Sequence, residues 1–160
     1  MSELSPSILQ PGDAIIYAPS DLFGCLIALK TFNRASHIEI YAGNNRSVAS
    51  RTFTGVNYYK LRTKNAMHVM RPAPLFGFKE AFYWFHKVAM GEPYDFKALL
   101  TFLCLAPKGD DGKQICSEFA TNFYRAGGLE PFQRDYPADK VPPSYFLISA
   151  AFNRVWSDGK

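Results

Sequence analysis

The stretch SHIEIYA, residues 36–42, predicts a strand that is buried on one face. Its apolar and polar residues alternate, so Ile38 and Ile40 fall on one face of the strand while His37 and Glu39 fall on the other. This alternation is typical of an antiparallel sheet that packs against a core on one side. It also places a histidine and a carboxylate on the same face, so this strand is a candidate for chemistry.

The residues around this strand predict a small antiparallel sheet in the first half of the chain. Directly after it, Gly43-Asn44-Asn45 indicates a hairpin turn, because glycine and asparagine accept positive φ angles. Apolar runs bounded by turn residues predict further strands. These are residues 14–17, 47–51, 55–61 and 66–71, with a last strand at 151–156 and a short helix at 21–31.

The second half of the chain predicts helices. Phe78, Phe82, Phe85 and Ala89 recur at helical spacing, which favours an amphipathic helix over residues 77–90. The other expected segments are apolar or amphipathic helices at 96–105 and 116–126, a polar loop at 108–113 and a turn or short helix at 144–148. Strands followed by helices predict the α+β class, here in one domain spanning residues 1–160.

Composition and charge narrow the classes of function. A chain of 160 residues with 48% hydrophobic and 20% charged residues is neither a disordered tail nor a coiled coil. The net charge is +4 without a run of Lys or Arg, so we expect no nucleic-acid partner and only weak attraction to anionic polymers or membrane surfaces. Every apolar run is shorter than the roughly 20 residues that span a bilayer, so no integral membrane segment is expected.

The cysteines and the first residues predict a reducing environment. Cys25, Cys104 and Cys116 match neither a zinc-binding spacing nor a CxxC redox motif, so no metal and no cofactor is expected. The start MSELSPSILQPGD lacks the charged and apolar regions of a signal peptide. We therefore expect a cytoplasmic protein with free thiols, released or associated with a virion if a phage encodes it.

Cys116 is the best candidate nucleophile among the three thiols. It stands at the start of the helix expected at 116–126, where unpaired backbone N–H groups and the helix dipole stabilise a thiolate and can hold a developing oxyanion. The alternative is a buried structural cysteine, which is common. Cys104 and Cys25 lie inside the apolar stretches LLTFLCLA and CLIAL, so both are expected in the core.

A nucleophilic thiol requires a base, and the chain has three histidines. His86 falls on the polar side of the Phe-rich helix and is expected to be solvated, whereas His68 lies in a strand and can face either way. His37 shares its strand face with Glu39. A histidine beside a carboxylate is a better candidate than a lone strand histidine, so we assign His37 as the base.

Four segments, in their order along the chain, resemble a known family. They are PGDAIIY at 11–17, SHIEIYAG at 36–43, GEPYDF at 91–96 and ICSEFATNFYRAGG at 115–128. The last two are similar to the motifs of NlpC-type papain-fold cysteine hydrolases. Because the histidine precedes the cysteine here, the chain resembles the circularly permuted branch of that family, which includes the YiiX-like proteins and, more distantly, the lecithin retinol acyltransferase relatives.

The resemblance implies a papain-like fold and a role for several residues. Cys116 would be the nucleophile and His37 its base, which agrees with the interpretation of the residues themselves. Tyr94 of GEPYDF would line the site and donate to the oxyanion, or else pack an interface. Ser117, next to the nucleophile, and Ser50 would contact the substrate.

The third, histidine-orienting residue is where the chain departs from the family. The permuted relatives place Glu or His on the next strand, where this sequence has SVAS, with Ala49 or Ser50 at the expected position. Glu39 is charged and lies two residues along the same strand face as His37. Ser50 would lie across the hairpin but is a weak partner for an imidazolium, so Glu39 is the predicted third residue, with Ser50 or a backbone carbonyl as the alternatives.

Three functions follow from these observations. The first is a thiol hydrolase that cleaves an amide bond, in a peptide of cell-wall type, through a Cys–His acyl-enzyme. The second is a lipid-directed amidase or acyltransferase on the same scaffold, with an acyl-amide substrate. The third is a catalytically idle structural or binding module, for example one that a phage encodes.

Overall fold

The computed structural model describes residues 3–20, 22–95 and 115–159. The helix expected at 96–105, the loop expected at 108–113 and Cys104 lie outside these residues. Within the described part of the chain, no helix has both the length and the apolar character that crossing a membrane requires.

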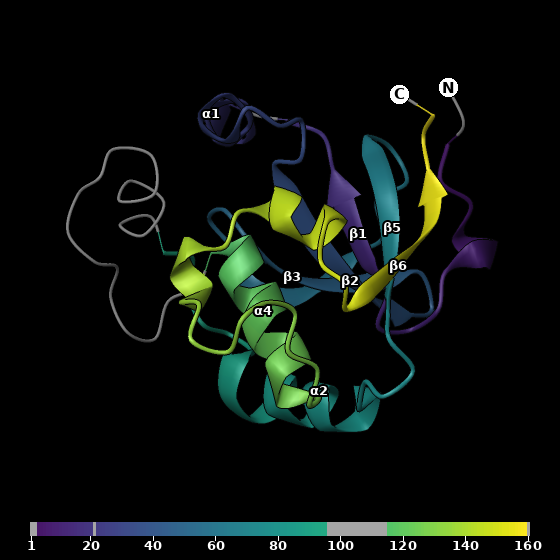
Figure 1. Cartoon of the computed structure of the whole chain (residues 1–160), viewed down its shortest axis with the longest axis vertical. Coiled ribbons are helices and arrows are strands. Elements are labelled where there is room, and N and C mark those ends of the chain that lie inside the picture. Colours follow the sequence, from purple (N-terminus) through teal and green to yellow (C-terminus); the bar gives the residue numbers. More distant parts are fainter. Residues whose placement is uncertain (1–2, 21, 96–114, 160) are drawn as a thin grey trace.

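Strands of the described part form an antiparallel sheet of six, in the order β4-β3-β2-β1-β5-β6 (Figure 1). Their bounds are β1 Ala14–Tyr17, β2 His37–Gly43, β3 Arg46–Arg51, β4 Gly55–Lys60, β5 Ala66–Pro72 and β6 Phe152–Ser157. The strands expected from the sequence are confirmed to within one residue at each end. The C-terminal strand β6 joins the edge next to β5, so both ends of the described chain contribute to one sheet.

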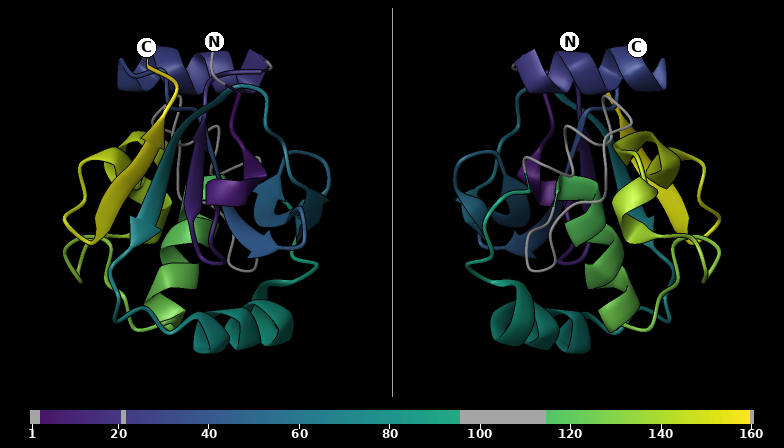
Figure 2. Two further views of the ribbon diagram at one scale, coloured as in Figure 1. Left: turned by 90° about the vertical axis from the view of Figure 1, so that its right-hand side faces the viewer. Right: turned by 90° about the vertical axis from the view of Figure 1, so that its left-hand side faces the viewer.

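The helices lie over one face of this sheet and at two opposite ends of the molecule. Their bounds are α1 Leu22–Thr31, α2 Phe78–Trp84 and α4 Cys116–Ala126, with a π-helical segment Phe85–Ala89 and short 3₁₀ turns at Pro6–Ile8, Ala138–Lys140 and Pro143–Leu147. Helix α4 packs against β2 and β3, and α2 packs against α4 (Figure 2). Helix α1 lies at the opposite end of the molecule from α2. The fold class is α+β, as expected.

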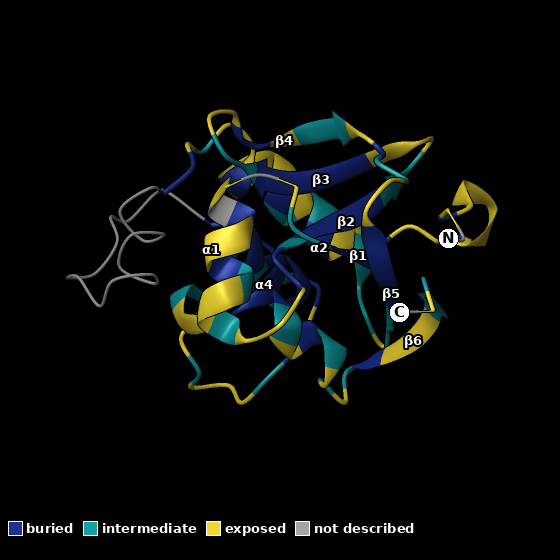
Figure 3. Ribbon diagram, turned by 90° about the horizontal axis from the view of Figure 1, so that it is seen from above, coloured by how far each residue is buried: buried dark blue, intermediate teal, exposed yellow. Residues whose placement is uncertain are grey.

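The sheet has a core on each face, and α4 builds the larger one. Phe119, Phe123 and Tyr124 of this helix are fully buried against the apolar face of β2, where Ile38 and Ile40 lie. The smaller core, on the other face, holds the following residues: Leu4, Leu9, Ile15, Tyr17, Tyr41, Leu61, Ala66 and Val69. The alternation of SHIEIYA therefore separates the aromatic core from the face that carries His37 and the buried Glu39. Most residues of β2 and β3 are buried (Figure 3).

Two turns position the strands and the segment before residue 96. At the β2–β3 hairpin Gly43, Asn44 and Asn45 have φ angles of 90°, 52° and 53°, as the turn residues predict. At Gly55 the chain segment after α2 approaches so closely that any Cβ would collide with the carbonyl oxygen of Glu92. That carbonyl accepts a hydrogen bond from the backbone N–H of β4, which ties this segment to the edge of the sheet.

Two expectations about helices are wrong in detail. The helix expected at 77–90 is α-helical only to Trp84 and then becomes π-helical, with the N–H of Met90 bonded to the carbonyl of Phe85. Cys25, expected in the core, is exposed. Helix α1 is apolar on every side, so its sequence carries no periodicity to indicate which face packs. Among the α1 residues whose burial is described, Gly24 and Ile27 are buried.

Candidate active site

Cys116 is the first residue of α4, and its side chain lies at the bottom of a pocket. Ile115 precedes it in an extended conformation, which turns the chain into the helix. Only 3% of Cys116 is exposed. The Glu118 carboxylate accepts a hydrogen bond from the Ile115 N–H at 3.4 Å, one turn into the same helix. The thiol therefore lies where the free backbone N–H groups of a helix begin.

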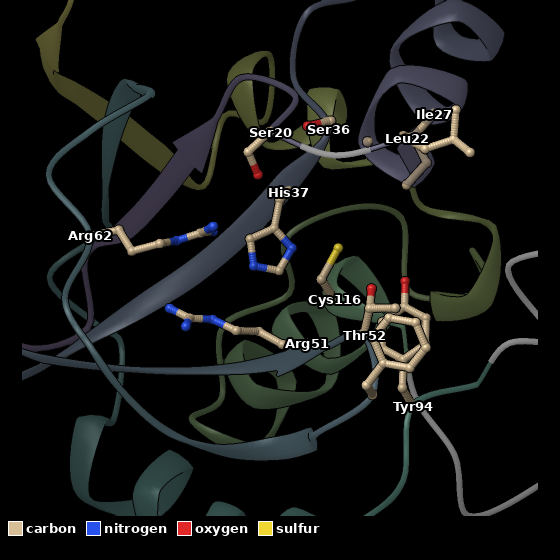
Figure 4. A pocket seen from close by; sticks show the side chains of 12 residues that line it. Ser20, Leu22, Ile27, Ser36, His37, Arg51, Thr52, Arg62, Tyr94 and Cys116 are labelled. Atoms are coloured by element: carbon tan, nitrogen blue, oxygen red, sulfur yellow. The ribbon is translucent and has the colours of Figure 1, made fainter.

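His37 is the first residue of β2 and shares the pocket with Cys116. One ring nitrogen of His37 faces the Cys116 sulfur, and the other is directed away from it (Figure 4). The pocket has a volume of about 380 Å³. Its described lining consists of Ser20, Leu22, Gly24, Ile27, Ser36, His37, Arg51, Thr52, Phe53, Arg62, Tyr94 and Cys116.

Glu39 lies behind His37 with its side chain fully shielded from solvent. The Nε2–H of His37 donates to Glu39 Oε1 at 3.1 Å. The Nε–H of Arg51 and an Nη–H of Arg62 donate to the same oxygen at 3.0 and 2.9 Å, while the Ser47 hydroxyl donates to Oε2 at 2.5 Å. The carboxylate therefore holds the histidine ring with one ring nitrogen left for the thiol.

The two guanidinium groups are fixed by aromatic rings. The Arg51 guanidinium carbon lies 4.1 Å from the centre of the Tyr59 ring, and that of Arg62 lies 4.6 Å from the centre of the Tyr17 ring. Stacking of this kind limits the freedom of a long side chain and adds a cation–π attraction. Both arginines are thus held in place before any ligand arrives.

The electrostatics of the site favour a charged histidine. Burial opposes charge on the imidazole, but the neighbouring Cys116 sulfur and the Glu39 carboxylate outweigh it and raise the pKa of His37 to about 9. Burial also opposes charge on the carboxyl, yet the hydrogen bond from His37 and the charges of His37, Arg62 and Arg51 lower the pKa of Glu39 to about 2. Both groups are charged at neutral pH.

Of the other predicted site residues, one lines the pocket and two do not. Tyr94 lines it and is 8% exposed. Ser50 and Ser117 are buried and are not among the described residues that line it. Because Arg51 reaches Glu39, its neighbour Ser50 points to the opposite face of β3, toward α4, and not toward the imidazole.

The remaining histidines lie elsewhere. His86 is exposed and its Nε2 lies 3.0 Å from the Tyr58 hydroxyl, while His68 is buried in β5. Asp95, which directly precedes the helix expected at 96–105, is buried, and that helix lies outside the described residues. In the described part of the chain, no three His, Cys, Asp or Glu side chains gather to hold a metal ion.

Sequence reasoning missed three partners of Glu39, namely Ser47, Arg51 and Arg62. One signal was available. The alternation of β3 puts Ser47 and Arg51 on one face of that strand, and in the β2–β3 hairpin this is the same sheet face that carries Glu39. A buried carboxylate needs donors, and this face was the place to look for them. Nothing comparable marked Arg62, which follows β4 and is 23 residues from Glu39.

Comparisons with known proteins show a similarity of fold. No family model matches the chain, and no curated protein matches it. The fold is shared with a solved structure. A structure described as "metalloprotein yiiX from Escherichia coli O157:H7, DUF1105" superposes with a TM-score of 0.68 over 93% of this chain and 97% of that one, at 17% sequence identity. A likeness at this identity concerns the fold.

Proposed function

We propose that the protein is a thiol hydrolase that cleaves an amide bond through a Cys116 acyl-enzyme. The observation that carries the proposal is the arrangement of three side chains. Cys116 and His37 share one pocket, with a ring nitrogen facing the sulfur, and buried Glu39 holds the other ring nitrogen at 3.1 Å. A nucleophile, a base and an orienting carboxylate in this order are the parts of a catalytic triad.

The chemistry follows from these positions. The Cys116 thiolate attacks the carbonyl carbon, a C–S bond forms, and the backbone N–H groups at the start of α4 hold the oxyanion. His37 then gives its proton to the departing amine as the C–N bond breaks, which leaves a thioester. Water attacks the thioester while His37 takes its proton. The C–S bond then breaks, the carboxylic acid departs, and the Cys116 thiolate and the protonated His37 are restored.

The order of the elements supports a circularly permuted papain-like arrangement. The strand with the histidine, β2, comes early in the chain, and the helix with the cysteine, α4, comes after the sheet strands β1 to β5. The four segments that resemble the permuted NlpC-type proteins include both elements, and the YiiX-like fold is consistent with that resemblance. The substrate class that the resemblance suggests is a peptide of bacterial cell-wall type.

A metal has no place in this proposal. The structural neighbour is described as a metalloprotein, but the described residues of this chain bring no set of ligands together. The donors around Glu39 are arginine, serine and histidine groups that bond to the carboxylate itself. Every step above is therefore assigned to the chain's own side chains and backbone.

The test is turnover combined with capture of the intermediate. Cell-wall peptide fragments are incubated with the protein, new amino groups are counted, and the protein is analysed by mass spectrometry after an acid quench. The proposal predicts released amines and a thioester on Cys116. Cys116→Ala should lose both, whereas Cys25→Ala, which removes an exposed thiol, should keep both. Equal turnover by Cys116→Ala would contradict a Cys116 nucleophile, and no turnover with no adduct would leave the idle-module alternative.

A second candidate is a lipid-directed amidase, and one observation favours it. The pocket is lined on one side by Leu22, Ile27 and Phe53, and 72% of Leu22 and 82% of Phe53 are exposed. Exposed apolar side chains at the mouth of a site suit an acyl chain. A series of N-acyl amides tests this: turnover that rises with chain length supports the lipid-directed reaction, and turnover independent of chain length contradicts it.

A further inference from the structure

The pocket contains more positive than negative charge. Arg51, Arg62 and the protonated His37 surround the single carboxylate of Glu39, and all three contact the same oxygen atom of it. Even with Cys116 as a thiolate, one positive charge remains uncompensated. The described residues that line the pocket include no acid.

The two guanidinium groups also keep unused hydrogen-bond donors. Nη2 of Arg51 lies 2.8 Å from Glu39 Oε1 as part of their ion pair, and Nε of Arg62 is buried without a hydrogen-bond acceptor. Both atoms are shielded from solvent, so a ligand in the pocket meets the other N–H groups of these two side chains, which are 24% and 35% exposed.

The two arginines are also held in fixed positions near the imidazole. Arg51 and Arg62 approach the imidazole from two sides (Figure 4), and the rings of Tyr59 and Tyr17 hold them there. A guanidinium group that is fixed in advance binds a carboxylate with little further loss of side-chain entropy. The two arginines therefore form a preformed positive site in the same pocket as the thiol, on the side of the imidazole away from the sulfur.

We infer that the pocket selects substrates that carry a carboxylate close to the scissile bond, and that Arg51 and Arg62 bind this carboxylate. The inference rests on the proposed thiol chemistry and adds the substrate class to it. A peptide with a free carboxylate beside the cleaved amide balances the surplus positive charge of the pocket, whereas a neutral acyl chain does not.

The experiment compares two alkylating reagents that differ only in charge. Iodoacetate and iodoacetamide each form a C–S bond with a thiolate and release iodide, but only iodoacetate carries a carboxylate. Rates at Cys116 and at exposed Cys25 are read from the same digest by peptide mass spectrometry. The iodoacetate-to-iodoacetamide ratio at Cys116 should exceed the ratio at Cys25 about tenfold at low salt, because the pocket that contains the sulfur carries one net positive charge.

Variants assign the preference to the arginines. Arg62→Gln should lower the charge ratio at Cys116 at least about threefold, and Arg62→Lys, which keeps the charge, should restore most of it. Arg154→Gln is the matched control, because it removes one arginine charge from exposed residue 154 of β6 at the far edge of the sheet. Circular dichroism shows whether each variant is folded, and the wild-type ratio tests the inference without any variant.

The outcomes separate this inference from the proposed function. A reactive Cys116 with the same charge ratio as Cys25 overturns the anion site and leaves the thiol hydrolase standing. A ratio that is high but unchanged in Arg62→Gln and Arg51→Gln also overturns the assignment. A Cys116 that reacts with neither reagent overturns the proposed function, and the inference is overturned with it.

Discussion

The negative charges of two buried carboxylates, one just before β1 and one on β2, are balanced in different ways. Asp13, just before β1, is 1% exposed, and the Arg71 guanidinium donates to its two oxygens at 2.9 and 2.8 Å. Glu39 on β2 is equally buried, but three cationic side chains crowd one of its oxygens. One site is a one-to-one ion pair, and the other carries surplus positive charge.

The difference separates a structural pair from a site prepared for a ligand. At Asp13 the charges cancel, and the backbone N–H of Gln10 also donates to the carboxylate, at 2.8 Å. At Glu39 the surplus charge faces the pocket that contains Cys116. A protein gains little stability from a second and third cation on one buried carboxylate, because each must be desolvated. We attribute the surplus positive charge to the binding of an anionic group in the pocket.

The largest effect is expected from Glu39→Gln. The variant leaves Arg51 and Arg62 uncompensated, so the free energy of unfolding should fall by about 3 kcal/mol. It also removes the charge that stabilises the imidazolium of His37, so turnover should fall at least about a hundredfold. Urea unfolding and amide hydrolysis measure the two effects. A variant with wild-type turnover would show that Glu39 has no role in orienting His37.

The matched change at the other carboxylate is Asp13→Asn. It breaks a buried pair with Arg71, so the free energy of unfolding should again fall, by about 3 kcal/mol. Because Asp13 is not among the described pocket residues, the turnover per folded molecule should equal that of the wild type. A loss of turnover similar to that of Glu39→Gln would contradict the assignment of a purely structural role to Asp13.

A third prediction concerns pH. The pKa of His37 is raised from 6.5 to about 9, so the folded state binds a proton more tightly than the unfolded state. The stabilisation is complete below pH 6.5 and is lost as the pH rises through 9. Urea unfolding should therefore show a wild-type advantage over His37→Gln that shrinks across this range. An advantage that grows with pH would mean that the buried histidine is neutral.

Glu39 gives the opposite dependence at acid pH. Its pKa is lowered from 4.5 to about 2, so its stabilisation is complete above pH 4.5 and is lost as the pH falls toward 2. Subtracting the unfolding free energy of Glu39→Gln from that of the wild type should isolate this loss. A difference that stays constant from pH 5 to pH 2 would contradict the charged cluster.

The smallest effect is expected at a third carboxyl group, which has acids as neighbours. Burial, together with the charges of Asp139, Asp95 and Glu92, raises the pKa of Glu118 to about 7. The folded state thus keeps a proton that the unfolded state releases above pH 4.5, and stability falls as the pH rises through 7. Glu118→Gln should be more stable than the wild type at pH 8, by about 1 kcal/mol. Reduced stability at pH 8 would contradict this.

The sequence predicted the elements that local patterns define. The alternation in SHIEIYA predicted β2 and placed His37 and Glu39 on one face, and their contact at 3.1 Å joins residues only two apart. Cys116 was expected at the start of the helix predicted at 116–126, and α4 begins there. These features need only the periodicity of a strand or the start of a helix.

The rest depended on long-range geometry. Whether Arg51 meets Glu39 is decided by the register between β2 and β3, and whether Arg62 does is decided by where the chain turns after β4. No local pattern encodes either. Cys25 was misplaced for a related reason, because a helix that is apolar on every side gives no indication of its buried face.

The pH dependence of Cys116 alkylation tests the central claim most directly. The rate with iodoacetamide is measured from pH 5 to pH 9 at Cys116 and at exposed Cys25 of the same molecule, in the wild type and in His37→Gln. A thiolate paired with the His37 imidazolium predicts that Cys116 remains reactive at pH 5 to 6, where Cys25 is slow, and that His37→Gln removes this reactivity. If Cys116 follows the curve of Cys25, and His37→Gln leaves it unchanged, then Cys116 and His37 do not form a catalytic pair.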